Sequence, residues 1–170
     1  MDAVELMTLQ QELLRDAEVV ESAAAAVGER LEGAGIAHEE AAGHQLCRLY
    51  NAIEQMALRV AKRFENAIDD PSRWHAELIR RVTLEIPGVR PALLPRDIEG
   101  PLADLRGFRH VFTHAYDLVL RRDRLKLLRG DGDRVAARLR TEVLRFVEAV
   151  AAMHAIPWPA DGNGGRRPEA

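Results

Sequence analysis

The sequence contains a single cysteine, Cys47, among its 170 residues. One thiol excludes a disulfide within the chain and a zinc site built from several cysteines, so the sequence fits a reducing compartment. No apolar run approaches the roughly 18 residues that a membrane-spanning helix needs. The opening MDAVELM is acidic, unlike the basic start of a secretory signal. We therefore expect a cytoplasmic protein that does not associate with a membrane.

Charge is unevenly distributed along the chain. The formal net charge of −3 argues against a protein that coats nucleic acid generally. Residues 1–40 contain ten acidic side chains against two arginines, whereas residues 106–129 contain seven basic side chains against two aspartates. The second segment is either a solvated helix end or a docking surface for RNA or a partner.

Apolar residues recur at spacings of three and four, the period of amphipathic helices. This pattern predicts one long helix that ends before the GAG at 33–35 and a second from about His38 to Ile68. A short third helix, capped by Ser72, is expected around Trp74, Leu78 and Val82, before the prolines of IPGVRPALLP.

A fourth helix is expected from Pro101 to about Leu120. Gly130 and Gly132 are expected to interrupt or fray the basic stretch that follows, and a last helix then carries the apolar residues from Val135 to Met153.

No segment alternates convincingly enough to predict a strand, so the expected fold is all-α, an antiparallel bundle of four to five helices. The length suits one domain, which we place at residues 1–155. Residues 156–170 are rich in proline, glycine and charge and are predicted to form a flexible tail.

The segment FRHVFTHAYD, residues 108–117, combines cationic, imidazole and phenol groups within the fourth helix. At about 100° per residue, an apolar stripe that includes Ala115 and Val119 faces the core. Arg109 and Tyr116 are then expected to be neighbours at the margin of this stripe. His110 and His114 are expected on the opposite face, together with Arg106 and Asp117.

Arg109 and His114 lie about 140° apart on such a helix, which makes their convergence within one chain difficult. A second copy solves this problem. If two fourth helices pack across a two-fold axis, both residues of both chains can line one cleft.

RHVFTH resembles the Arg-x4-His motif of the HEPN superfamily of small helical domains, and RHVFTHAY adds a tyrosine as in the HepT-like toxins. The flanking WHAELIRRVTLEIPGVRPALL and LADLRGFRHVF extend the resemblance over roughly residues 5–153. It implies a HEPN-like homodimer that acts as a metal-independent endoribonuclease without a cofactor. Arg109 and His114 then match the catalytic pair.

These residue types suit the implied reaction, because histidine titrates near neutrality and guanidinium binds phosphate through a charged fork. The resemblance gives His110 an accessory role in orienting phosphate or carrying a proton. It makes Tyr116 the target of AMP addition by a minimal nucleotidyltransferase antitoxin. Arg106, Arg121 and Arg122 are candidates for further RNA contacts.

Other interpretations stay open at this point. A catalytically inactive HEPN domain could act as a dimerising or nucleotidyltransferase-binding module. Thr113 favours this alternative, because HepT-like relatives often carry a basic residue at this position and its loss would weaken a phosphate site. A generic helical interaction protein is a third interpretation. His110 and His114 have the spacing of two metal ligands on one helix, but no motif supplies the remaining ligands.

Overall fold

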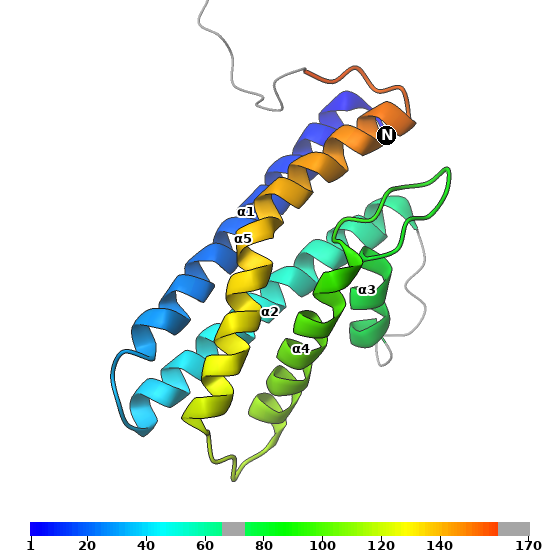
Figure 1. Ribbon diagram of the computed structural model, residues 1–170. Helices are drawn as coiled ribbons and strands as arrows, with labels where there is room; N and C mark the ends of the chain where they lie inside the picture. The colour runs from blue at the N-terminus through cyan, green and yellow to red at the C-terminus, as the bar shows by residue number, and fades with distance from the viewer. Residues whose placement is uncertain (66–73, 160–170) are drawn as a thin grey trace, which may run out of the picture.

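The computed structural model describes residues 1–65 and 74–159. The main elements of this part are five α-helices and one short 3₁₀ helix, arranged as shown in Figure 1. They are α1 (Ala3–Arg30), α2 (Ile36–Phe64), α3 (Trp74–Val82), η1 (Arg96–Ile98), α4 (Glu99–His114) and α5 (Arg122–Met153). The predicted all-α bundle is confirmed. Among the described residues, no helix combines the length and the apolar character needed to cross a membrane.

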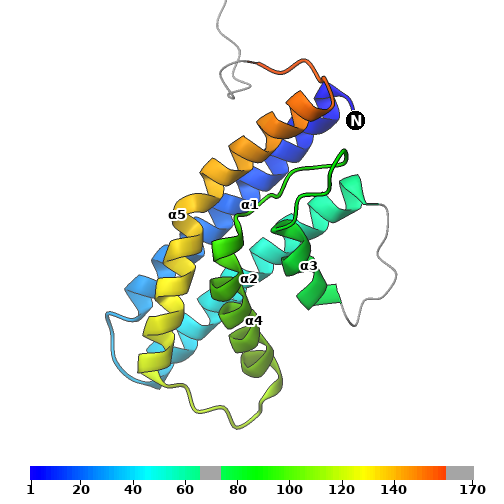
Figure 2. The same cartoon turned by 45° about the vertical axis from the view of Figure 1, so that its right-hand side comes forward.

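The three long helices α1, α2 and α5 form the body of the bundle, as Figure 2 shows. α1 begins with a capping box, in which the Asp2 carboxylate accepts from Glu5 N and the Glu5 carboxylate accepts from Asp2 N. The apolar stripe predicted for this helix is buried along its whole length. Its members are Leu6, Leu9, Leu13, Ala17, Val20, Ala24, Val27 and Leu31.

α2 starts two residues before the predicted His38 and is described to Phe64, so the predicted end at Ile68 lies outside the described residues. Gly35 precedes it with φ of 101°, a conformation that glycine adopts without strain. The predicted cap at Ser72 also lies outside the described residues.

An arginine inside the protein holds the connection between α3 and α4 in place. The side chain of Arg90 is 1% exposed, and its Nε donates to Glu65 Oε1 over 2.9 Å. Its terminal nitrogens donate to the carbonyls of Leu84 and Arg81. Arg90 therefore ties the loop after α3 to the end of α2, and this loop leads directly into η1 and α4.

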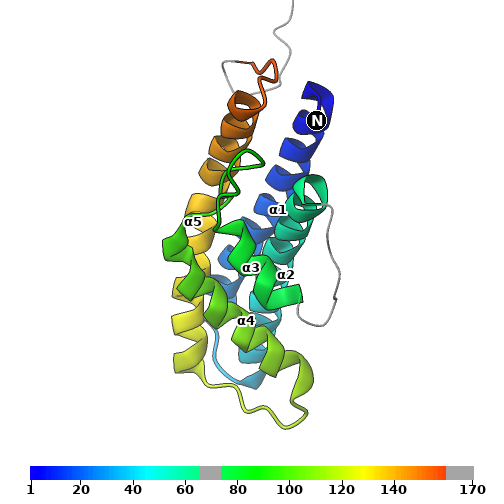
Figure 3. The ribbon, with the colours of Figure 1, turned by 90° about the vertical axis from the view of Figure 1, so that its right-hand side faces the viewer.

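α3 and α4 lie on one side of the long helices, and this side faces the viewer in Figure 3. α4 packs against α2 and α5. It ends at His114, and the expected continuation to Leu120 is wrong: Ala115 has ψ of 122°, outside the helical region. Residues 115–121 instead form the connection that lets the chain reverse direction into α5. Ala115 and Val119, which were expected to face the core, are exposed.

α5 is continuous from Arg122, so the expected interruption at Gly130 and Gly132 is also wrong. Leu128 and Val135 are buried on either side of the two glycines. The packing of the buried face of α5 outweighs the loss of helix stability, about 1 kcal/mol per glycine, that glycine causes in a helix interior.

Packing against the core also continues past the predicted domain limit at residue 155. Ile156 is buried and Trp158 is partly buried against the core. The remainder of the predicted tail, residues 160–170, lies outside the described residues.

Candidate functional site

Arg109 lies on the side of α4 that faces α2. Its Nη1 is 3.4 Å from Glu54 Oε1, and its guanidinium carbon lies 5.6 Å from the centre of the Tyr50 ring. The Arg109 side chain is 28% exposed, whereas that of Glu54 is 9% exposed and Tyr50 is fully buried. Arg109 is therefore a cation held against the bundle with part of its guanidinium open to solvent.

His114 is the last residue of α4 and is exposed. Its Nδ1 lies 2.8 Å from the carbonyl oxygen of His110 and 2.9 Å from Thr113 Oγ1. A carbonyl oxygen can only accept, so Nδ1 carries the hydrogen in this arrangement. The neutral ring then has its lone pair on Nε2, where it can accept a proton from another molecule.

His110 is exposed and its ring lies beside that of His114, with 4.7 Å between the ring centres. The predicted sharing of one helix face by these two imidazoles is confirmed. Within residues 1–65 and 74–159, no group of three or more His, Cys, Asp and Glu side chains is placed to hold a metal ion.

The structure keeps Arg109 and His114 apart within the chain. Arg109 contacts residues of α2, whereas His114 is exposed at the end of α4 and its ring bonds only back along its own helix among the described residues. This agrees with the angular separation that the sequence predicts. One chain thus presents the two groups at different places.

Tyr116 does not lie beside Arg109, and the expectation that the two are neighbours is wrong. The expectation assumed a helix that continues through residue 116, but α4 has ended two residues earlier. Tyr116 is 99% exposed in the connection to α5. Its hydroxyl is therefore open to a macromolecule that approaches from solvent.

The basic residues around the motif have different surroundings. Arg106 is partly exposed, and Arg121 is exposed with its Nη2 2.7 Å from Asp123 Oδ2. Arg122 is turned toward the α1–α2 connection and donates to the carbonyls of Leu31 and Gly33. Arg122 is therefore engaged in joining two parts of the fold.

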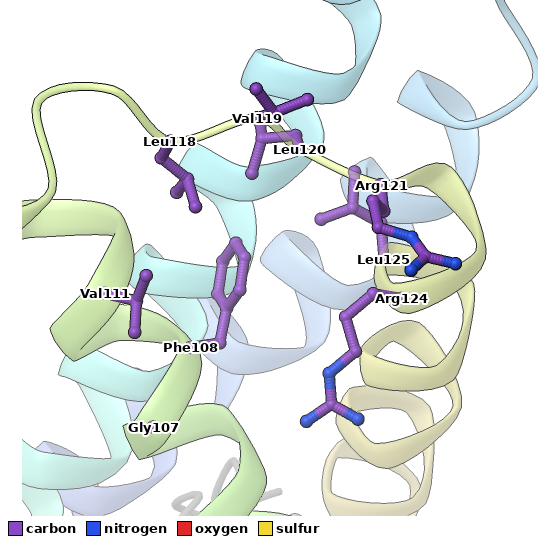
Figure 4. A pocket seen from close by; sticks show the side chains of 9 residues that line it. All are labelled: Gly107, Phe108, Val111, Leu118, Val119, Leu120, Arg121, Arg124 and Leu125. Carbon is purple, nitrogen blue, oxygen red and sulfur yellow. The ribbon is translucent and has the colours of Figure 1, made fainter.

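A pocket of about 260 Å³ opens between α4, the 115–121 connection and the start of α5. Figure 4 shows Phe108 and Val111 on the α4 side, with Leu118 and Leu120 across from them. Arg121 and Arg124 border the pocket on the α5 side. The pocket is mostly apolar, which suits an apolar group from a partner.

Sequence reasoning missed Tyr50 and Glu54, the α2 residues that hold Arg109. They are four residues apart and so share one face of α2. Burial raises the pKa of the Tyr50 hydroxyl, and the neighbouring Glu54 raises it further. The available signal was an acidic residue next to Ile53 within an apolar stripe, a position where a buried charge needs a partner.

Comparison with known families places these residues in a wider context. The family model described as HepT-like protein matches residues 41–150, which is more than half of the chain and includes both Glu54 and the motif on α4. No curated protein and no solved structure gives a significant match. The extent of the family match shows that the chain belongs to the HepT-like family.

Proposed function

We propose that this protein is the toxin of a toxin–antitoxin pair and acts in the cytoplasm as a metal-independent endoribonuclease. Membership of the HepT-like family supports the proposal, and the observation that carries it is the arrangement on α4. A partly exposed arginine and an exposed histidine with its Nε2 lone pair free to accept a proton lie five residues apart. These two groups are the proposed catalytic residues, Arg109 and His114.

The proposed reaction uses the 2′-hydroxyl of RNA as the nucleophile. Its oxygen attacks the adjacent phosphorus while His114 Nε2 takes the proton. The bond from phosphorus to the 5′-oxygen then breaks, which leaves a 2′,3′-cyclic phosphate, and a protonated imidazole supplies the hydrogen of the 5′-hydroxyl. The Arg109 guanidinium stabilises the negative charge that develops on the phosphoryl oxygens.

We place the complete site between two copies of the chain. Arg109 and His114 diverge within one chain, and a two-fold axis near α4 would bring an arginine from one copy toward a histidine of the other. It would also supply the two imidazoles that the reaction uses. Val111 is 45% exposed and Val119 is 82% exposed, and both apolar side chains line the pocket between α4 and α5.

Tyr116 is the proposed control point. A minimal nucleotidyltransferase antitoxin would transfer AMP to it, with the tyrosine oxygen attacking the α-phosphate of ATP and pyrophosphate leaving. The full exposure of Tyr116 supports access by such an enzyme. The added nucleotide would introduce bulk and negative charge close to the cleft and repel the RNA backbone.

Expression of the wild type, Arg109→Ala and His114→Ala tests the proposed activity through growth and the integrity of total RNA. The wild type should arrest growth and cleave RNA, and both variants should be harmless while keeping the helical content of the wild type. A mixture of the two variants should recover some cleavage if each dimer cleft combines residues from both chains.

An inactive family member that serves as a dimerising or transferase-binding module is the second candidate, which Thr113 favours. If the wild type is harmless and leaves RNA intact but still forms dimers, the result would support the binding-module function and overturn the proposed ribonuclease activity. Intact-mass measurement after co-expression with a nucleotidyltransferase encoded nearby tests the modification. A mass increase matching AMP that persists in Tyr116→Phe would contradict the assignment of the target.

A further inference from the structure

Arg109 is held by residues of another helix. α4 supplies its backbone, but the groups that contact its guanidinium, Glu54 and Tyr50, both belong to α2. The Glu54 carboxylate is 9% exposed, so it is less hydrated than a surface carboxylate and attracts the cation more strongly.

The two α2 residues restrict Arg109 in different ways. The Tyr50 ring lies 5.6 Å from the guanidinium carbon and provides a flat apolar face with a favourable quadrupole. Glu54 Oε1 attracts one terminal nitrogen over 3.4 Å and so limits how the guanidinium can swing. An arginine without such contacts samples many rotamers, and each phosphate contact would have to overcome that freedom.

The contact with Glu54 leaves donors for a second anion. Guanidinium has five N–H donors, and the ion pair with Glu54 occupies only one terminal nitrogen, Nη1. Nε and Nη2 have no hydrogen bond or ion pair with the described residues, and the side chain is 28% exposed. The pair can therefore orient the guanidinium while its other edge stays able to bind phosphate.

The surroundings on α2 supply a single negative charge next to Arg109. Cys47 and Tyr50 lie on the same side of α2 as Glu54, and both are buried. Burial raises the pKa of both groups, with Glu54 adding to the effect at Tyr50, so both are uncharged near neutrality. Glu54 is thus the α2 group that can form an ion pair with Arg109.

We propose that Glu54 is the positioning residue for Arg109 in RNA cleavage: its buried carboxylate on α2 sets the direction in which the α4 guanidinium presents its remaining donors to the scissile phosphate. The inference rests on the proposed ribonuclease function and assigns a role to a residue outside the motif on α4. Glu54 acts through Arg109 and does not touch the RNA.

Steady-state cleavage of a labelled single-stranded oligoribonucleotide of mixed sequence tests this role with Glu54→Gln, which keeps the shape and removes the charge. We expect kcat to fall about 10- to 100-fold, as for misplacement of a catalytic group, while KM changes much less. Asp16→Asn is the matched control, because Asp16 also pairs with an arginine, Arg59, over 2.8 Å, but this ion pair joins α1 to α2 and does not involve Arg109. This control should keep the wild-type kcat.

A double-mutant cycle separates positioning from a general loss of structure. In the Arg109→Ala background, Glu54→Gln should cause no further loss of cleavage, because the group that it positions is gone. An equal loss of kcat in both backgrounds, or a kcat within twofold of wild type for Glu54→Gln alone, would overturn the proposal.

A measurement without substrate keeps the inference separate from the proposed function. The Nε–Hε signal of Arg109 in nitrogen–proton NMR spectra, assigned by its loss in Arg109→Lys, should shift and broaden in Glu54→Gln but not in Asp16→Asn. An unchanged signal would show that Glu54 does not hold Arg109. If this signal changes as expected in a protein that never cleaves RNA, the proposed ribonuclease function is wrong, and so is the role of Glu54 in positioning Arg109 for cleavage.

Discussion

Gly43 of α2 lies directly against the ring of Phe112 of α4, so closely that a methyl group at position 43 would be 2.6 Å from Phe112 Cε2. Gly43→Ala must therefore push away the Phe112 ring, which packs between α2 and the half of α4 that carries Arg109 and His114. We expect a loss of about 1–3 kcal/mol in the free energy of unfolding, as for other overpacked sites, measured by urea denaturation.

Gly107→Ala provides the control for this substitution, because a methyl group there meets no atom within 4 Å. It should leave the fold intact and raise stability by about 0.5–1 kcal/mol, the usual gain of alanine over glycine in a helix. A Gly43→Ala protein as stable as the wild type would show that α2 and α4 do not pack as closely as described.

The continuity of α5 leads to a second prediction. Gly130 is exposed within the helix, and a methyl group there meets no atom within 4 Å. Gly130→Ala should raise the free energy of unfolding by about 0.5–1 kcal/mol, whereas Gly130→Pro should lower it by about 3 kcal/mol because proline breaks a helix interior. Equal stability of the alanine and proline variants would indicate a helix that is already interrupted at this position.

Two adjacent arginines should respond differently to truncation. Arg122→Ala removes donors from the carbonyls of Leu31 and Gly33, so we expect a loss of about 1.5–3 kcal/mol in the free energy of unfolding, the range for hydrogen bonds that involve charged groups. Arg121→Ala removes only an exposed pair with Asp123, which is worth at most about 1 kcal/mol.

The same pair of variants separates a structural arginine from one that contacts RNA. Arg121→Ala should weaken binding of a non-cleavable 2′-O-methyl oligonucleotide most at low salt, because screening already reduces a phosphate contact at high salt. If Arg121→Ala binds this oligonucleotide with the affinity and the salt dependence of the wild type, Arg121 does not belong to the proposed RNA surface.

Cys47 provides a prediction about pH. Burial raises the pKa of its thiol to about 11 from an ordinary value of 9.0, although the nearby Arg109 opposes the shift. The native thiol should thus react with iodoacetamide at pH 8 far more slowly than the unfolded chain does. Rapid alkylation of the native protein at this pH would contradict the burial described for Cys47.

The raised pKa also fixes the sign of the stability change. Well below pH 9 the Cys47 thiol is neutral in both the folded and the unfolded chain, so its contribution to the free energy of unfolding is fully present. As the pH rises from 9 toward 11, the thiol ionises readily only in the unfolded chain, and this contribution is lost. Two pKa units correspond to at most about 2–3 kcal/mol. Denaturation midpoints between pH 8 and 11 should fall less steeply in Cys47→Ala, and the remaining slope reflects Tyr50, whose raised pKa acts in the same direction.

The core-facing side of α1 could be predicted residue by residue because this helix packs along its whole length, and a helical period then reports burial directly. The same reasoning failed at Ala115 and Val119. Their spacing continues the period of α4, but where α4 ends depends on the reversal into α5, which no local pattern encodes.

The candidate site was predictable only on one helix. The motif drew attention to Arg109 and His114, and their angular separation already indicated that they diverge. The contact between Arg109 and Glu54 joins residues 55 positions apart. Periodicity places Glu54 on the inner side of α2, but it cannot say which cation lies opposite, because that depends on how two helices are docked.

The end of α4 at His114 places Tyr116 outside the helix that carries the proposed catalytic residues. An enzyme that acts on Tyr116 would therefore meet an exposed turn in the connection to α5 and could enclose it without unwinding any helix. Inactivation by such an enzyme would leave the bundle intact, so a toxin silenced in this way could be stored in its folded state and restored simply by removing the added group.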